Sequence, residues 1–252
     1  MSFLQKVMNI ESIQVDYLMA TALFVGTPFF VFFGWLSDKV GRKAVMMTGM
    51  IIAIISYRPI YDSMFKSVDL KTKTIAAEGI LEKRTVKVHD KITTDSLITF
   101  HKEVSYTDGT LMKKDSIVHW TPSGVAMKDG KAEEPKVSKS ITVNDSTKWY
   151  LVLMVFIQVI FVTMVYGPIA AFLVEMFPVR IRYTSMSLPY HIGNGVFGGL
   201  LPAVATYLVT SGKDAGHATW YLEGLWYPIG VAAVCLVIGL IYLKNKNNNI
   251  HD

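Results

Sequence analysis

GWLSDKVGRK, residues Gly34–Lys43, lies between two apolar runs that are each long enough to cross a lipid bilayer. A membrane-crossing helix needs about 20 mainly apolar residues, and several segments of the chain meet this requirement. The five segments are Tyr17–Leu36, Ala44–Tyr61, Trp149–Leu173, Thr184–Val209 and Tyr221–Tyr242. The sequence therefore predicts an all-α membrane protein with five transmembrane helices, in which the charged stretch is a short loop between two spans.

Lysine and arginine are distributed unequally between the short loops, and loops rich in these residues stay in the cytoplasm. One side of the predicted membrane carries seven of them: Lys39, Arg42, Lys43, Arg180, Arg182, Lys244 and Lys246. The short segments on the other side carry only Lys6 and Lys213. We therefore expect a cytoplasmic C-terminus in the cell's inner (plasma) membrane, with the N-terminus outside.

A polar segment, residues 63–147, follows the second span and falls on the extracytoplasmic side. Two stretches in it, one beginning at Thr85 and one covering Ser96–Trp120, alternate apolar and polar residues, as half-buried strands do. Asp108-Gly109 between two such runs indicates a hairpin. Further turn signals are Pro122-Ser123-Gly124 and Asp129-Gly130. We expect a small β-rich extracytoplasmic insert.

The predicted organisation has four parts. Residues 1–62 hold a short amphipathic N-terminal helix and two spans, residues 63–147 the insert, residues 148–243 three spans and residues 244–252 a cytoplasmic tail. Within the insert, the stretch KAEEPKVSK from Lys131 is expected to be an exposed linker.

Composition and motifs narrow the possible functions. The net charge of +5 comes from basic residues interleaved with acids, so we expect no nucleic-acid partner. The single cysteine, Cys235, excludes an intrachain disulfide and a cysteine-based metal site. Three histidines of the insert, His89, His101 and His119, lack a compact ligand spacing. No catalytic or phosphate-binding motif occurs in a suitable context, so we expect neither an enzyme nor a cofactor or metal.

The pattern G-x-L-S-D-x-x-G-R-K in Gly34–Lys43 resembles the signature loop of the major facilitator superfamily of transporters. VEMFPVRIRYTS, Val174–Ser185, is similar to the loop after the tenth helix in the metabolite:proton symporters of that family. Ser187–Leu208 resembles their eleventh helix, and the apolar run before the signature resembles the eighth. The resemblance covers residues 1–62 and 148–243. It implies that the five spans are helices eight to twelve of the C-terminal half-bundle, and that the first seven helices are missing from this chain.

The resemblance also implies a conformational switch at the cytoplasmic ends of the spans. Its residues would be Gly34, Asp38, Gly41, Arg42 and Lys43 of the signature loop, with Glu175, Arg180 and Arg182 as their counterpart in the other loop. Physically, Gly34 lets a neighbouring backbone approach and Gly41 permits a tight turn. Asp38 can meet the positive end of another helix. We expect that helix to belong to the N-terminal half of the carrier, which this chain does not include.

Polar residues inside membrane spans are candidates for substrate contact. They are Gln158, Tyr166, His191 and Asn194, and hydrogen bonding between helices is the alternative role for each. The three-residue spacing of His191 and Asn194 places them on one face of an α-helix. Arg58 lies close to the outer surface, where Asp62 can pair with it. Snorkelling of the Arg58 side chain to the interface is the preferred account.

Taken as a member of this family, the chain would be part of a secondary transporter that works by alternating access. The resemblance implies proton-coupled symport of a small organic solute, with the lipid bilayer, the solute, protons and the N-terminal half as partners. Two alternatives stay open. The chain is a truncated or split-gene fragment without independent transport activity, or it is an interaction partner within the membrane.

Overall fold

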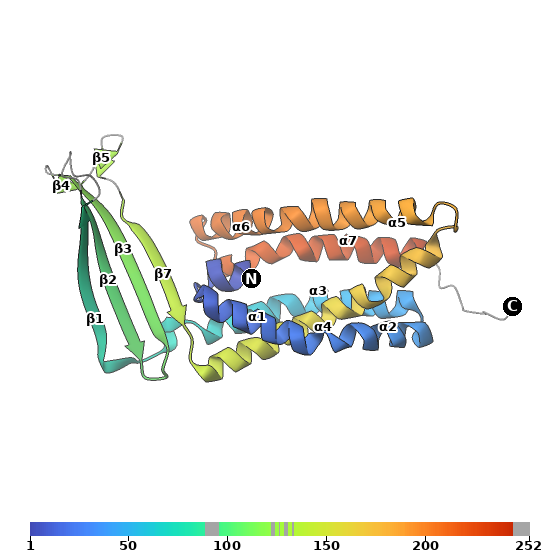
Figure 1. The fold of residues 1–252 in the computed structure, drawn as a ribbon, viewed down its shortest axis with the longest axis horizontal. Coiled ribbons are helices and arrows are strands. Elements are labelled where there is room, and N and C mark those ends of the chain that lie inside the picture. Colours follow the sequence, from blue (N-terminus) through green and yellow to red (C-terminus); the bar gives the residue numbers. More distant parts are fainter. Residues whose placement is uncertain (89–95, 122–123, 126, 129–130, 133, 244–252) are drawn as a thin grey trace. The chain divides into compact units, whose positions relative to one another are not determined.

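The computed structural model describes residues 1–252 except 89–95, 122–123, 126, 129–130, 133 and 244–252 (Figure 1). The helices are α1 (Ser12–Gly26), α2 (Pro28–Val40), α3 (Arg42–Ser67), α4 (Asp145–Met176), α5 (Arg182–His191), α6 (Gly199–Asp214) and α7 (Trp226–Tyr242). Five helical stretches are long and apolar enough to cross a membrane: Ser12–Val40, Arg42–Ser67, Asp145–Met176, Arg182–Asp214 and Trp220–Tyr242. The prediction of five spans is confirmed, and the chain is a multi-pass membrane protein.

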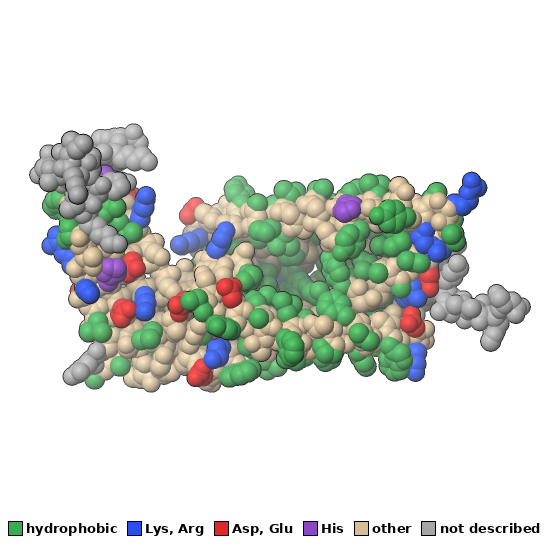
Figure 2. Space-filling view, viewed as in Figure 1, with side chains coloured by type: hydrophobic (Ala, Val, Ile, Leu, Met, Phe, Trp, Pro, Cys, Tyr) green, Lys and Arg blue, Asp and Glu red, His purple; other side chains and the backbone are tan. Residues whose placement is uncertain are grey.

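Two compact units make up the molecule. The sheet unit consists of Met1–Tyr17 and Ser67–Trp149, and the helical unit of Leu18–Lys66 and Tyr150–Asp252. The boundaries differ from the predicted ones because the first seventeen residues join the sheet unit. In the helical unit, hydrophobic side chains cover the length of the helices and charged side chains gather at the end where α2 and α4 end (Figure 2). This distribution suits helices whose sides face lipid.

Prolines affect the first two spans differently: Pro28 marks the start of a new helix, whereas Pro59 lies inside a continuous one. The first predicted span is two helices, α1 and α2, which meet at Thr27 before Pro28. The Thr27 hydroxyl donates a hydrogen bond to the carbonyl of Leu23 at 2.8 Å. In contrast, α3 continues through Pro59 and ends at Ser67, past the predicted end near Tyr61. A proline removes one helical hydrogen bond, and neighbouring helices can compensate for that loss inside a membrane.

The fourth span contains a π-helical segment, Ile192–Gly198, between α5 and α6. A π-helix forms i→i+5 hydrogen bonds and therefore has a wider turn than an α-helix. His191 ends α5, whereas Asn194 lies in the π-helical turn. The α-helical spacing that predicted a shared face for these two residues does not apply here. The fifth apolar stretch begins with a short 3-10 helix, Trp220–Leu225, which leads directly into α7.

The sheet unit contains the predicted strands. Its main strands are β1 (Ile75–Val88), β2 (Ser96–Tyr106), β3 (Leu111–Thr121) and β7 (Lys136–Thr142), with the two-residue strands β4 (Gly124–Val125), β5 (Met127–Lys128) and β6 (Lys131–Ala132). The main strands are all antiparallel, in the order β1-β2-β3-β7, and β4 also pairs with β3. The β-rich prediction is confirmed, but the stretch from Lys131 is only partly a linker. Its second half forms β7, because pairing of Ser138 with Asp115 of β3 satisfies its backbone.

The hairpin predicted at Asp108-Gly109 joins β2 to β3. Gly109 has a φ of 85°, and its amide donates to the carbonyl of Tyr106 at 3.0 Å. The amide of Tyr106 in turn donates to the carbonyl of Thr110 at 2.9 Å, which closes a three-residue loop. The turn signals that begin at Pro122 and Asp129 involve residues outside the described part of the chain. His89, Lys244 and Lys246 also lie outside it.

The N-terminus does not form the expected amphipathic helix. Phe3–Val7 make one π-helical turn, and Asn9 then adopts a left-handed backbone conformation with a φ of 55°. Ile10 forms a parallel bridge with Ile141 of β7. Leu4, Met8 and Ile10 are buried, so tertiary contacts with the sheet unit outweigh the local helical pattern.

Acid is expected to weaken the hairpin through Asp108. Partial burial opposes ionisation of this carboxyl, but hydrogen bonds from Lys73 and Thr110 outweigh it and lower the pKa. A lowered folded-state pKa stabilises the fold above the unfolded-state value, about 3.9, and this contribution is lost as the pH falls through the folded-state value. Denaturant unfolding between about pH 5 and pH 2 checks the expectation. The unsubstituted chain should lose more stability on acidification than Asp108→Asn, and equal losses would contradict the assignment.

Candidate conformational-switch site

The backbones of α2 and α4 approach closely at two glycines. A Cβ on Gly167 would lie 3.0 Å from the carbonyl oxygen of Phe30 and 3.3 Å from the amide nitrogen of Gly34. A Cβ on Gly34 would meet the carbonyl oxygen of Gly167 at 4.0 Å, an ordinary contact. The close approach expected at Gly34 is therefore present, but Gly167 is the residue that permits it. The sequence pattern missed Gly167 because this residue lies outside the signature loop.

The turn between α2 and α3 depends on Gly41. This residue has a φ of 103°, a conformation that residues with a side chain rarely adopt. Its amide donates to the carbonyl of Ser37 at 2.9 Å, and the buried Ser37 hydroxyl donates to the carbonyl of Gly34 at 2.6 Å. These bonds fix the end of α2. As a result, Asp38 lies one helical turn from the start of α3.

Arg42 connects three helices at this end of the helical unit. Its guanidinium Nη2 lies 3.2 Å from Oδ1 of Asp38 at the end of α2 and 2.9 Å from Oε1 of Glu175 near the end of α4. The Arg42 side chain is 18% exposed, against 39% for Glu175 and 61% for Asp38. The pair with Glu175 is therefore the better shielded from water and contributes more than the pair with Asp38. The structure brings together the two halves of the predicted switch cluster that this chain encodes.

Lys43 contacts a fourth helix that the sequence did not suggest. Its Nζ donates to the carbonyl oxygens of Leu240, at 3.0 Å, and Leu243 at the C-terminus of α7. A cation at this position satisfies helix-end carbonyls and complements the negative end of the helix dipole. Nearby, a Cβ on Gly239 would meet Met47 at 2.8 Å, so α3 and α7 pack tightly below the lysine. Adjacent residues of one turn, Arg42 and Lys43, thus hold α3 to different neighbours.

The loop between α4 and α5 contributes less to the cluster than expected. Arg182 donates from Nε to the carbonyl of Phe177 at 3.2 Å, which closes the local turn before α5. Arg180 is exposed and forms no hydrogen bond or ion pair with any residue that the structure describes. Of the three counterpart residues, only Glu175 reaches the signature loop.

The intramembrane candidates fall in separate places. The hydroxyl of Tyr166 on α4 donates to Oδ1 of Asn194 in the π-helical turn at 2.8 Å, so these two act together. Gln158 faces α3 instead, and its Nε2 lies 3.3 Å from the carbonyl of Met154 and 3.4 Å from the sulfur of Met64. These contacts match the alternative role of hydrogen bonding between helices. The four candidates, Gln158, Tyr166, His191 and Asn194, therefore do not share one set of hydrogen bonds.

His191 lines a largely apolar pocket between α4 and α5. The other lining residues are Ala170, Leu173, Tyr183, Met186, Ser187 and Tyr190. Apart from the tyrosine hydroxyls, His191 and Ser187 supply the polar groups of this lining. The pocket therefore suits a mainly apolar group better than a strongly charged one.

The possible ion pair between Arg58 and Asp62 does not form. Asp62 instead accepts from Nζ of Lys66 and from the hydroxyl of Tyr221, both at 2.6 Å. The guanidinium of Arg58 lies 4.6 Å from the ring centroid of Trp226, in a cation–π contact. The i,i+4 spacing permitted either arrangement, and aromatic residues from the start of the fifth span decided it. Within the described residues, no group of three or more His, Cys, Asp or Glu side chains could hold a metal ion.

The amino-acid sequence of the chain is similar to those of several membrane transporters. The chain is 28% identical over 131 residues to a putative metabolite transport protein of Haemophilus influenzae, which covers 52% of this chain and 26% of that protein. It is 37% identical over 78 residues to a citrate-proton symporter of Salmonella typhi, covering 31% and 18%, respectively. It is 33% identical over 100 residues to a putative proline/betaine transporter of Staphylococcus aureus, covering 40% and 20%.

The chain thus spans less than a third of the length of these curated relatives. No family model matches the chain, and no solved structure matches it. The transporter relatives, the five apolar helices and the signature loop at the turn between α2 and α3 agree with one another. Together they support a membrane transporter of the major facilitator type.

Proposed function

We propose that the chain is the part of a secondary transporter that contains helices eight to twelve and the C-terminal cytoplasmic switch. The single observation that supports this most is the contact of Arg42 with both Asp38 and Glu175. An ion-paired cluster that joins three helix ends can form in one conformation and break in another, as alternating access requires. The seven preceding helices would supply the other half, because transport of this kind needs two halves that rock around one site.

A small organic solute that moves together with protons is the proposed cargo. The Salmonella typhi relative is named as a citrate-proton symporter, and the Staphylococcus aureus relative as a proline/betaine transporter. The hydrogen-bonded pair of Tyr166 and Asn194 is the proposed polar contact for that solute, with His191 and Gln158 as secondary candidates. Its position at a π-helical turn supports this choice, because such turns occur often at functional sites.

Uptake by proteoliposomes tests the proposal. Vesicles should contain the chain alone, the first seven helices of the Salmonella typhi relative alone, or both, with labelled citrate or proline outside and an imposed pH gradient. We expect uptake only when both halves are present, and we expect it to fall when the gradient is collapsed. Robust uptake by the chain alone would show an independent carrier. No uptake with both halves would favour the alternative of a membrane interaction partner.

The proposed orientation places the signature loop in the cytoplasm and the sheet unit outside the inner membrane. Lys39→Cys and Ser138→Cys, each in a Cys235→Ser background, should report this orientation because both positions are exposed. A membrane-impermeant maleimide should label Ser138→Cys in intact spheroplasts and Lys39→Cys only after permeabilisation. The reverse labelling pattern would invert the proposed topology.

A further inference from the structure

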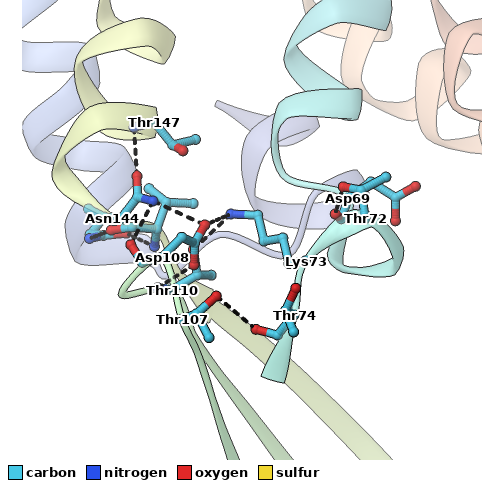
Figure 3. Close-up of polar contacts among 11 residues, drawn as sticks. Asp69, Thr72, Lys73, Thr74, Thr107, Asp108, Thr110, Asn144 and Thr147 are labelled. Atoms are coloured by element: carbon cyan, nitrogen blue, oxygen red, sulfur yellow. Dashed lines mark hydrogen bonds and ion pairs between the residues drawn. The ribbon is translucent and has the colours of Figure 1, made fainter. Parts of the chain in front are cut away.

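The start of α4 is fastened to the hairpin loop between β2 and β3. Oδ1 of Asn144 accepts from the amide of Thr147 at 2.7 Å, which makes Asn144 the N-cap of α4. Nδ2 of the same side chain donates to the main-chain carbonyl of Asp108 at 2.9 Å and to Oδ2 of Asp108 at 3.1 Å (Figure 3). One amide therefore caps the helix and holds the hairpin. Loss of Asn144 would release both.

The chain segment that leaves α3 is fastened to the same loop. Nζ of Lys73 donates to Oδ2 of Asp108 at 2.6 Å and to the hydroxyl of Thr110 at 2.8 Å (Figure 3). Thr110 is fully buried and the Lys73 side chain is only 11% exposed, so water replaces these bonds poorly. The amide of Thr107 also donates to the carbonyl of Thr74 at 3.0 Å.

The start of α1 is fastened to the end of β7, although 129 positions separate these residues along the chain. The side-chain amide of Gln14 donates to the carbonyl of Val143 at 3.0 Å and accepts from its amide at 2.9 Å. On the preceding residues, the amide of Glu11 donates to the carbonyl of Ile141, and Oε2 of Glu11 accepts from the hydroxyl of Thr142 at 2.9 Å. An insert that served only to connect α3 to α4 would need no bonds to α1.

We propose that the sheet unit is a clasp that fastens the start of α1, the exit of α3 and the start of α4 to one another. The clasp residues are Gln14, Lys73, Asp108 and Asn144. Because these residues form one hydrogen-bonded network within the sheet unit, the start of α1, the exit of α3 and the start of α4 keep a fixed spacing there. The clasp depends on membrane insertion but not on the proposed solute or on proton coupling.

Asp108 is the central group of the clasp. Its carboxylate and main-chain carbonyl receive bonds from both Lys73 and Asn144, which come from opposite ends of the insert. Gln14 is an independent second point, because among the described residues its side chain hydrogen-bonds to Val143 and not to the hairpin loop. Substitutions at these two points should therefore loosen different spans. Asp108 controls α3 and α4, and Gln14 controls α1.

A distance measurement on the full chain in lipid nanodiscs tests the clasp. Spin labels at Asp16→Cys and Ser146→Cys, both exposed, report on the starts of α1 and α4 in a Cys235→Ser background. We expect a narrow distance distribution in the unsubstituted clasp, and at least a twofold broadening in both Gln14→Ala and Asp108→Ala. Asp115→Ala is the matched control, because this aspartate lies on the same sheet and, within the part of the insert that the structure describes, pairs only with His101.

Asp108→Asn serves where Asp108→Ala fails to fold, since it keeps the size of the side chain and removes the charge that holds Lys73. Circular dichroism should confirm that each labelled variant is folded. Broadening in the clasp variants with a narrow control supports the clasp. A distribution that stays narrow in the folded Gln14 and Asp108 variants overturns it. Neither result depends on uptake, so failure of the proposed transport function would be seen separately.

Discussion

Replacing Arg42 by glutamate is expected to abolish most of the solute uptake that depends on the switch residues. The substitution removes the 2.9 Å pair with Glu175 and places a third carboxylate beside Asp38 and Glu175. Attraction between α3 and α4 then becomes repulsion at a partly shielded position. In the two-half uptake assay, we expect the initial rate of Arg42→Glu to fall at least about tenfold, which corresponds to about 1.4 kcal/mol in the barrier.

Two further variants separate a specific cluster from a merely charged loop. The exchange Arg42→Glu with Glu175→Arg keeps the pair in reversed order and should recover most of the lost rate. Lys39→Glu makes the same change of charge in the same loop, where the ammonium lies 4.1 Å above the ring of Trp35. We expect Lys39→Glu to retain activity. If both single variants lose activity equally, the loop acts by its net charge alone.

Gly167→Ala is expected to destabilise the helical unit more than Gly34→Ala does, although Gly34 belongs to the signature loop and Gly167 does not. A methyl group on Gly167 would lie 3.0 Å from a backbone oxygen of α2, and backbone cannot rotate away as a side chain can. Separating the two helices should cost about 1–3 kcal/mol. The same methyl on Gly34 meets only an ordinary contact at 4.0 Å.

Thermal unfolding of the purified chain in detergent checks this order of stability. Gly199→Ala is the control, because a Cβ at Gly199 would meet nothing within 4 Å. Alanine favours a helix over glycine by up to about 1 kcal/mol, so the control should unfold at the same temperature or higher. A midpoint for Gly167→Ala equal to that of Gly199→Ala would mean that α2 and α4 do not pack closely at this glycine.

Local patterns predicted most of the secondary structure, because each depends on a short stretch of chain. The five apolar segments gave five spans, and period-two alternation gave β1, β2 and β3. The hairpin at Asp108-Gly109 followed from residues that tolerate a left-handed turn. The failures have a common cause. The N-terminal segment and the stretch from Lys136 adopt their structures through pairing with distant residues, and neither pairing leaves a local signal.

The switch residues show the same division. The resemblance of Gly34–Lys43 and Val174–Ser185 to two loops of the family identified Arg42, Lys43 and Glu175 as candidates before their positions were known. It did not identify Gly167 or the end of α7 as their neighbours. Helical spacing also allowed Asp62 as a partner of Arg58, whereas Lys66 and Tyr221 bind Asp62 and Trp226 contacts Arg58. Helical spacing limits which residues can meet within one helix, but it contains no information about the helix that packs alongside.

By itself, the sequence determined the number of apolar spans, the strand-rich segment and the resemblance to a transporter family, because hydrophobic length, alternation and a dense motif are properties of contiguous residues. Only the tertiary structure decided which charges pair, which glycine sets the approach of α2 to α4, and that the sheet unit binds the start of α1. These contacts join residues far apart in the chain. They depend on backbone positions that packing of several elements fixes together, and no single stretch of sequence specifies those positions.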